Sequence, residues 1–181
     1  PKLCKHMHIP VQSACNNTLK MMNRKYTVEE FTEIIDKIRS IKPDINITTD
    51  LIVGFPTESN EDFKDSLGNA EKLRFGKIHV FPYSKRNGTA ASKMKNIVTD
   101  KQKSERTHLM LELSDKLEKE YYKKFIGKEV TVLTEEFKDG FTFGYTDNYL
   151  RVKIGKKLDK GIMVNVKIKE IDDLTLIGDL L

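Results

Sequence analysis

The stretch at residues 48–63, TTDLIVGFPTESNEDF, constrains the fold more than any other part of the chain. An apolar run ends at Val53, a Gly-Phe-Pro turn follows, and Ser59 stands where the N-cap of a helix is expected. A buried strand that leads through a short turn into a capped helix is typical of a parallel α/β sheet. In such folds functional side chains gather on the loops that follow the strands.

Strand and helix patterns alternate through residues 1–123. We expect strands at 6–12, 45–53 and 77–83. Three strands cannot close a barrel, so the sheet should be open or completed by sequence outside this chain. Helix starts are marked by capping residues: Asn16 or Asn17, Thr27 with Glu30, Ser59 or Asn60, and Thr99 with Gln102. The last of these should open a helix of about 25 residues.

From Gly127 onward the apolar period changes from helical spacing to two. Five short segments alternate in this way, which predicts five antiparallel strands in a small OB-like β-barrel at residues 124–181. In this region Phe141 and Phe143 alternate as core residues do. The predicted fold class is therefore α/β plus all-β, with a boundary between residues 123 and 124.

Alternation along the first three strands places polar and aromatic groups on the face turned away from the helices. A solvated sheet face would account for this pattern, and so would a functional site. A metal-dependent hydrolase is one alternative, because imidazoles and a carboxylate suit zinc. Its candidate ligands are His6, His8, Asp50 and His79.

Composition favours a soluble globular protein, with 38% hydrophobic and 33% charged residues. The sequence has no apolar run near the length of a membrane span, and two cysteines are too few for a disulfide framework. We therefore expect a cytoplasmic protein that does not bind a membrane. The first residue, Pro1, fits a segment excised from a longer chain.

Positive charge is concentrated in the middle of the chain. Residues 72–103 carry nine basic side chains and one acidic one, whereas residues 124–181 carry ten of each sign. If the chain meets a polyanion, the middle segment should supply most of the long-range attraction. A solvated, lysine-rich surface is the simpler alternative.

Four motifs give the chain a family resemblance: HIPVQSACNNTLKMMNRKYT at 8–27, TTDLIVGFP at 48–56, FPYSKRNGTAA at 81–91 and GYTDNYLRV at 144–152. Together they resemble the radical S-adenosylmethionine methylthiotransferases, and the last motif resembles their RNA-binding TRAM barrel. Asn148 and Tyr149 resemble the branch that acts on threonylcarbamoyladenosine beside the tRNA anticodon. The resemblance implies the C-terminal part of a radical SAM partial barrel at 1–123 and a TRAM domain at 124–181.

The resemblance also implies S-adenosylmethionine and two [4Fe-4S] clusters in the full-length enzyme. The family holds these clusters with two sets of three cysteines, which Cys4 and Cys15 cannot replace. We therefore expect this chain alone to bind no cluster and to be inactive, with no catalytic and no metal-binding residue of its own. We expect Cys15 to be an ordinary thiol rather than a cluster ligand.

The expected cofactor-binding residues are Gln12, Ser13, Arg24, Thr48 and Asp50, with Arg24 as a candidate partner for a carboxylate. The expected RNA-binding residues are Tyr83, Lys85, Arg86, Tyr145, Tyr149, Arg151 and Lys153. The expected partners are tRNA and S-adenosylmethionine, without DNA. A plain RNA-binding module without catalysis is the competing class for this chain.

Overall fold

The computed structural model describes residues 3–181 and divides into two compact units. One comprises residues 8–43 and 47–117, and we call it the sheet unit. The other comprises residues 3–7, 44–46 and 118–181, and we call it the barrel unit. The long helix that ends the predicted first domain thus contributes its last turns to the barrel unit.

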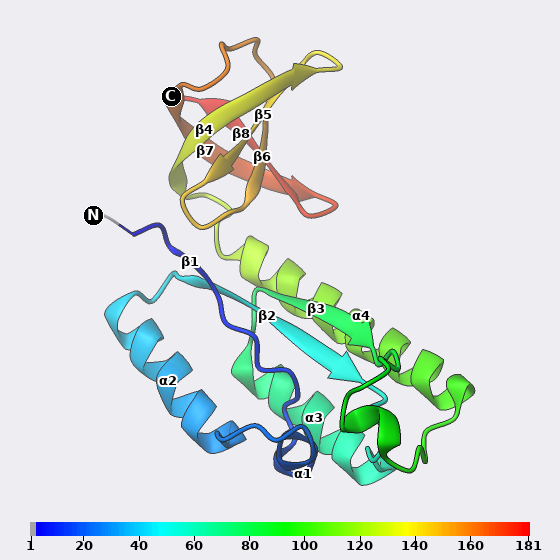
Figure 1. The fold of residues 1–181 in the computed structure, drawn as a ribbon. Coiled ribbons are helices and arrows are strands. Elements are labelled where there is room, and N and C mark those ends of the chain that lie inside the picture. The colour runs from blue at the N-terminus through cyan, green and yellow to red at the C-terminus, as the bar shows by residue number, and fades with distance from the viewer. Residues whose placement is uncertain (1–2) are drawn as a thin grey trace. The chain divides into compact units, whose positions relative to one another are not determined.

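Strands and helices alternate in the first part of the chain as the sequence predicts (Figure 1). A parallel pair, β2 and β3, belongs to a sheet with the order β1-β2-β3. The elements are β1 (His6–His8), α1 (Asn16–Met21), α2 (Val28–Ile41), β2 (Asn46–Val53), α3 (Asn60–Leu73), β3 (Lys77–Pro82), the 3-10 turn η1 (Ala91–Lys93) and α4 (Asp100–Lys123).

The first strand is shorter than the predicted 6–12. It ends before Pro10, which has no amide hydrogen to give to a neighbouring strand. Pairing with β2 resumes at Gln12, which forms an isolated parallel bridge with Leu51.

Helix starts follow the capping signals in three of four cases. Full capping boxes join Thr27 to Glu30 and Ser59 to Asp62, and Thr99 and Gln102 make the same reciprocal bonds. The exception is α1. Its N-cap is Cys15 without a side-chain bond, because the Asn16 side chain instead accepts from the Val28 amide and donates to Glu29.

The sheet has one covered face and one half-open face. Ile47, Leu51 and Val53 are fully buried on the side where α2 and α3 lie (Figure 1). On the other side Asp50 is half-buried and Phe81 is exposed. The alternation predicted from sequence is confirmed at these positions.

Helix α4 closes the free edge of β3. The Ser114 hydroxyl accepts a hydrogen bond from the Ile78 amide and donates one to the Ile78 carbonyl, both at 3.0 Å. These are the main-chain groups that a fourth strand would use. The sheet therefore ends at β3.

The C-terminal part of the chain forms a closed five-stranded barrel with the order β4-β5-β6-β8-β7 (Figure 1). Four of its strand pairs are antiparallel, but β6 and β8 run parallel, so the all-antiparallel prediction is wrong for that pair. Five is odd, and a ring of five strands cannot alternate in direction without one parallel pair. The strands are β4 (Glu129–Lys138), β5 (Phe141–Thr146), β6 (Arg151–Ile154), β7 (Met163–Asp172) and β8 (Thr175–Leu180).

The interior of the barrel corrects the predicted orientation of β5. Thr142 and Thr146 are buried, whereas Phe141 and Phe143 are only partly buried and belong to the outer face. The reason is Gly144, where an added Cβ would lie 2.2 Å from the Leu133 carbonyl oxygen. Because β4 approaches β5 this closely, only a glycine fits between them, and its neighbours Phe143 and Tyr145 must point outward.

No helix among residues 3–181 combines the length and the apolar character that crossing a membrane requires.

Gly144→Ala should destabilise the barrel by about 3 kcal/mol, because the new methyl group would overlap main-chain atoms that cannot move aside cheaply. Gly155→Ala is the matched control, since an added Cβ there meets nothing within 4 Å. Urea denaturation of the two variants measures the difference. Equal stability would show that β4 and β5 do not pack this closely.

Candidate functional site

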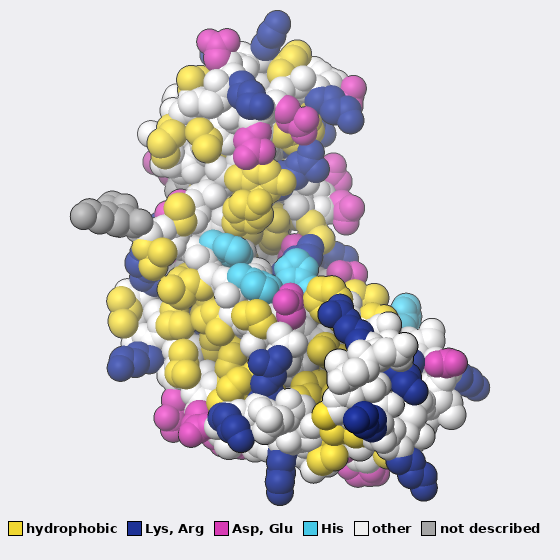
Figure 2. All heavy atoms as spheres, viewed as in Figure 1, with side chains coloured by type: hydrophobic (Ala, Val, Ile, Leu, Met, Phe, Trp, Pro, Cys, Tyr) yellow, Lys and Arg dark blue, Asp and Glu magenta, His cyan; other side chains and the backbone are white. Residues whose placement is uncertain are grey.

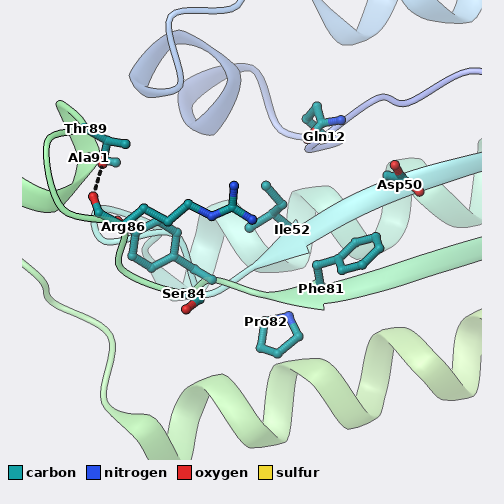
Figure 3. A pocket seen from close by; sticks show the side chains of 10 residues that line it. Gln12, Asp50, Ile52, Phe81, Pro82, Ser84, Arg86, Thr89 and Ala91 are labelled. Carbon is teal, nitrogen blue, oxygen red and sulfur yellow. Dashed lines mark hydrogen bonds between the residues drawn. The ribbon is translucent and has the colours of Figure 1, made fainter.

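A cavity of about 500 Å³ opens on the half-exposed face of the sheet unit, at the ends of β2 and β3 (Figure 3). This is the edge where parallel α/β sheets bind ligands. Four residues predicted from sequence meet there, from three separate segments of the chain. The lining residues are Gln12, Asp50, Ile52, Phe81, Pro82, Tyr83, Ser84, Arg86, Thr89 and Ala91.

Gln12 reaches the cavity through an unusual backbone conformation. Its φ is +64°, in the left-handed region that residues other than glycine seldom adopt. Two main-chain bonds hold it there: its amide donates to the Asp50 carbonyl and its carbonyl accepts from the Ile52 amide, both at 2.9 Å. Strained residues of this kind are common at ligand sites.

Asp50 forms part of a polar cluster on the same face. Its Oδ1 lies 3.3 Å from Nε2 of His8, and Nδ1 of His8 lies 3.0 Å from the Thr48 hydroxyl. The His79 ring stands edge-on to His8, with a centroid distance of 5.6 Å. The Asp50 carboxylate also lines the cavity, where it can accept a hydrogen bond from a ligand hydroxyl or amino group.

Tyr83 brings a hydroxyl group to the wall of the cavity. The hydroxyl is buried and has no hydrogen-bond partner within residues 3–181, which is costly unless a ligand or water supplies one. The ring packs edge-on against Phe55 of the Gly-Phe-Pro turn, at 5.5 Å between centroids. A polar ligand in this cavity would satisfy the hydroxyl.

Arg86 extends from the loop after β3 toward Ile52 and Gln12 (Figure 3). Thr89 fixes this turn, because its hydroxyl donates to the Arg86 carbonyl at 2.8 Å. The rest of the loop exposes Lys85, Lys93 and Lys95. Figure 2 shows lysine and arginine side chains standing out from the surface around it.

The turn between β2 and α3 is anchored by a buried ion pair that sequence reasoning missed. Glu58 Oε2 accepts from the Gly54 amide at 2.8 Å and from Arg106 Nη1 at 2.7 Å. Arg106 also donates to the Glu58 carbonyl and to Asn60. Burial raises the pKa of Glu58, although Gly54 and Arg106 oppose the shift. The pair holds the turn, and with it Phe55, beside Tyr83.

Several predicted cofactor residues lie outside the cavity lining. Ser13 is fully buried and accepts from the Cys15 amide at 3.3 Å, and Thr48 is buried behind His8. Arg24 is exposed after α1. None of these three residues lines the cavity, whereas Gln12 and Asp50 do.

Cys15 serves the packing between the α1 loop and α3. Its thiol donates to Asp62 Oδ1 at 3.4 Å, and burial is the main cause that raises its pKa. Asp62 in turn accepts from Asn17 and from the Ser59 amide. The thiol is therefore already engaged within the protein.

The four candidate ligands of the hydrolase alternative do not form a metal-binding group in the part of the chain that the structure describes. His8, Asp50 and His79 share one face, but His6 stacks on Tyr149 instead, at 5.3 Å between ring centroids. Within residues 3–181 no three His, Cys, Asp or Glu side chains are grouped as metal ligands.

On the barrel unit, the predicted RNA residues divide into two kinds. Tyr145 and Tyr149 stack on each other at 4.9 Å, whereas Arg151 and Lys153 lie over the rings of Phe143 and Phe141. Asn148 is buried, so it cannot meet a substrate directly. The interior glycine of β5 was the signal that could have predicted the outward aromatic row.

Comparisons with known proteins agree with the family resemblance. Residues 2–69 match the sequence model of the Radical SAM superfamily. The chain is 42% identical to the tRNA-2-methylthio-N(6)-dimethylallyladenosine synthase of Endomicrobium trichonymphae, over 99% of this chain and 43% of that protein. It is 41% identical to the threonylcarbamoyladenosine tRNA methylthiotransferase MtaB of Bacillus subtilis, over 92% of this chain and 38% of that protein.

The chain thus spans about two fifths of the length of these curated relatives. Among solved structures, the archaeal Elp3 of Methanocaldococcus infernus with an N-terminal deletion aligns with a TM-score of 0.42 and 14% identity, over 96% of this chain and 55% of that one.

Arg106→Met should lower the free energy of unfolding by about 3–5 kcal/mol at pH 7, because Glu58 would stay buried as an unpaired charge. Removing Arg106 should also raise the pKa of Glu58 further. The folded state then holds a proton that the unfolded state has lost, so stability falls as pH rises between the unfolded and the folded pKa. The loss of unfolding free energy should therefore be smaller at pH 4 than at pH 7. Urea denaturation at the two pH values measures it.

Lys101→Met is the control on the same helix, because Lys101 forms an exposed pair with Glu105 at 3.9 Å. It should cost no more than about 0.5 kcal/mol at either pH. A pH-independent loss in Arg106→Met would argue against a charged Glu58 as the cause.

Proposed function

We propose that this chain is the C-terminal part of a tRNA methylthiotransferase of the radical SAM superfamily, because relatives named as such enzymes match it along nearly its whole length. The proposed reaction adds a methylthio group to a modified adenosine beside the anticodon. The observation that carries the proposal is the cavity at the ends of β2 and β3. This cavity, of about 500 Å³, has room for a nucleoside. Gln12, Asp50 and Tyr83 line it, and the buried Tyr83 hydroxyl has no hydrogen-bond partner within residues 3–181.

In this proposal the sheet unit is part of a radical SAM partial barrel, and the five-stranded barrel is a TRAM domain. The closed barrel and the parallel sheet support the assignment. With tRNA as its partner, the protein would act in the cytoplasm.

The polar groups that line the cavity suit an adenosyl ligand. Asp50 and Gln12 would bind hydroxyl or amino groups, and the Tyr83 hydroxyl would gain the partner that it lacks. Phe81 and Pro82 supply apolar walls that exclude water. S-adenosylmethionine supplies the radical chemistry when it is bound, while these residues orient it.

The chain's cysteines do not fit an iron–sulfur cluster. Such clusters need several thiolates at one site, but Cys4 is exposed and the Cys15 thiol is buried against Asp62. We therefore assign cluster binding to parts of the full-length enzyme outside this chain, and expect this chain alone to be catalytically inactive.

Exposed basic side chains and exposed aromatic rings support tRNA as the proposed substrate. Lys85, Arg86, Lys93 and Lys95 stand on one exposed loop, where they can contact phosphates. The same features would let this chain bind RNA without catalysis, which makes an RNA-binding module the second candidate function for the chain by itself.

We further propose threonylcarbamoyladenosine as the modified base, from the resemblance of GYTDNYLRV at 144–152. Within that motif Asn148 is buried, so its part would be to hold Tyr149 rather than to touch the base. Relatives named for both adenosine modifications match with near-equal identity, and a direct comparison of two tRNAs decides between them.

In the full-length enzyme, Asp50→Asn should lower methylthiolation by about 5- to 150-fold, because a lost bond to a buried ligand group costs about 1–3 kcal/mol. The product would be measured by mass spectrometry of digested tRNA, with tRNAs that carry either modified adenosine. Asp36→Asn, on the exposed side of α2, is the control. Full activity of Asp50→Asn would remove the cavity from the mechanism. Conversion of the dimethylallyl tRNA alone would overturn the assigned base.

Charge reversal of the loop should weaken tRNA binding by this chain. Lys85→Glu, Lys93→Glu and Lys95→Glu together remove phosphate contacts, and the slope of affinity against salt should become shallower. The control reverses three exposed lysines on other helices, Lys37, Lys64 and Lys101. Filter binding over a salt series measures both. Equal losses in the two triple variants would show that only net charge matters.

A further inference from the structure

A histidine at the end of β1, His8, stands beside Asp50 but outside the lining of the cavity in the sheet unit. The carboxylate of Asp50 does line the cavity, and Figure 3 shows it at the opposite end from Arg86 and Thr89. Oδ1 of this carboxylate lies 3.3 Å from Nε2 of His8. A ligand in the cavity would therefore meet Asp50, and His8 would act on the ligand through Asp50.

The main chain places the two side chains on the same face of the sheet. The Ile9 amide donates to the Thr48 carbonyl, and the Gln12 amide donates to the Asp50 carbonyl, both at 2.9 Å. Because side chains alternate along a strand, Thr48 and Asp50 share one face of β2. The bond at Ile9 holds the end of β1 in register with β2, so that His8 reaches both of these side chains.

Both ring nitrogens of His8 are engaged. An ionised carboxylate only accepts hydrogen bonds, so Nε2 must carry the hydrogen that it gives to Asp50. Nδ1 lies 3.0 Å from the Thr48 hydroxyl, which can donate to a neutral ring or accept from a protonated one. The His79 ring packs edge-on to His8, at 5.6 Å between centroids. The bond to Asp50 is thus compatible with both charge states of the ring, and these neighbours restrict the ring's rotation.

Asp50 gains from such a partner because water reaches it. Its side chain is 31% exposed, and a carboxylate this open can adopt several rotamers in the absence of a ligand. Holding it in one rotamer beforehand reduces the conformational entropy that is lost when a ligand binds. A bond from the ring of His8 supplies this restraint, and it is strengthened by the charge of the carboxylate.

We infer that His8 is a positioning residue of the cavity: it orients the Asp50 carboxylate toward a hydroxyl or amino group of the ligand. The Thr48 hydroxyl in turn holds the ring of His8. The inference rests on the proposed function, which makes S-adenosylmethionine the ligand of this cavity. His8 therefore contributes to the affinity for the cofactor without touching it.

The test measures binding of S-adenosylmethionine to the full-length enzyme by anaerobic equilibrium dialysis. His8→Leu removes the donor and should weaken binding about tenfold. His8→Gln keeps an N–H donor near the place of Nε2 and should stay within about threefold of the unaltered enzyme. His8→Asn is one methylene shorter, so its amide cannot reach Asp50 and it should lose as much affinity as His8→Leu.

A double-mutant cycle separates positioning from a merely structural role. With Asp50→Ala in place there is no carboxylate to orient, so adding His8→Leu should change the affinity by less than about twofold. Thermal denaturation checks that each variant is folded. His8→Asn takes the place of His8→Leu in the cycle if the leucine variant does not fold.

His108→Leu is the control, because His108 forms a similar pair with Glu112, at 3.1 Å, on the exposed side of α4. It should bind the cofactor as the unaltered enzyme does. Unchanged binding in His8→Leu would overturn the inference. So would an equal loss with and without the Asp50 carboxylate, or a loss in His8→Gln as large as in His8→Leu.

The proposed function fails separately. If the unaltered full-length enzyme leaves its tRNA unmodified while cofactor binding still depends on His8, the assigned reaction is wrong and the role of His8 stands. If the enzyme modifies its tRNA but the His8 variants bind the cofactor normally, the role of His8 is wrong and the reaction stands.

Discussion

Buried strand ends leave main-chain amides and carbonyls without strand partners, and the sheet unit depends on side-chain oxygens that satisfy them. The Thr49 hydroxyl accepts from the Val11 amide and donates to the Ile9 carbonyl, both at 2.8 Å. The Ser66 hydroxyl accepts from the Ala14 amide, and the Glu58 carboxylate accepts from the Gly54 amide. The bonds of Thr49 and Ser66 join distant segments and that of Glu58 closes a local turn, so together they fix the loops that carry the cavity as well as the strands themselves.

Local signals in the sequence predicted much of the sheet unit, because caps and strand alternation act over a few residues. Thr27, Ser59 and Thr99 mark helix starts correctly for this reason. Contacts that depend on packing escaped prediction. Arg106 binds Glu58 across 48 positions of sequence, and the ring of His6 stacks on the ring of Tyr149. No periodicity encodes either contact.

The barrel shows how one residue can override a hydrophobic pattern. Phe141 and Phe143 alternate as core residues, yet Gly144 and the close approach of β4 turn them outward. The core is filled from elsewhere, by Tyr121, Tyr122 and Phe125 at the end of α4 together with residues of the other strands. Burial raises the pKa of Tyr122 to about 12, so this hydroxyl stays protonated at neutral pH and leaves no charge in the barrel core.

Ser114 determines at which edge of the sheet another strand could pair. With both outward groups of Ile78 bound to its hydroxyl, the β3 edge offers no free ladder at that position, and α4 stands where another strand would lie. Any strand that extends this sheet, whether from a longer version of the chain or from another molecule, must therefore add beside β1. A single hydroxyl thus blocks strand addition at the β3 edge. It also protects this edge from the strand pairing that leads to aggregation.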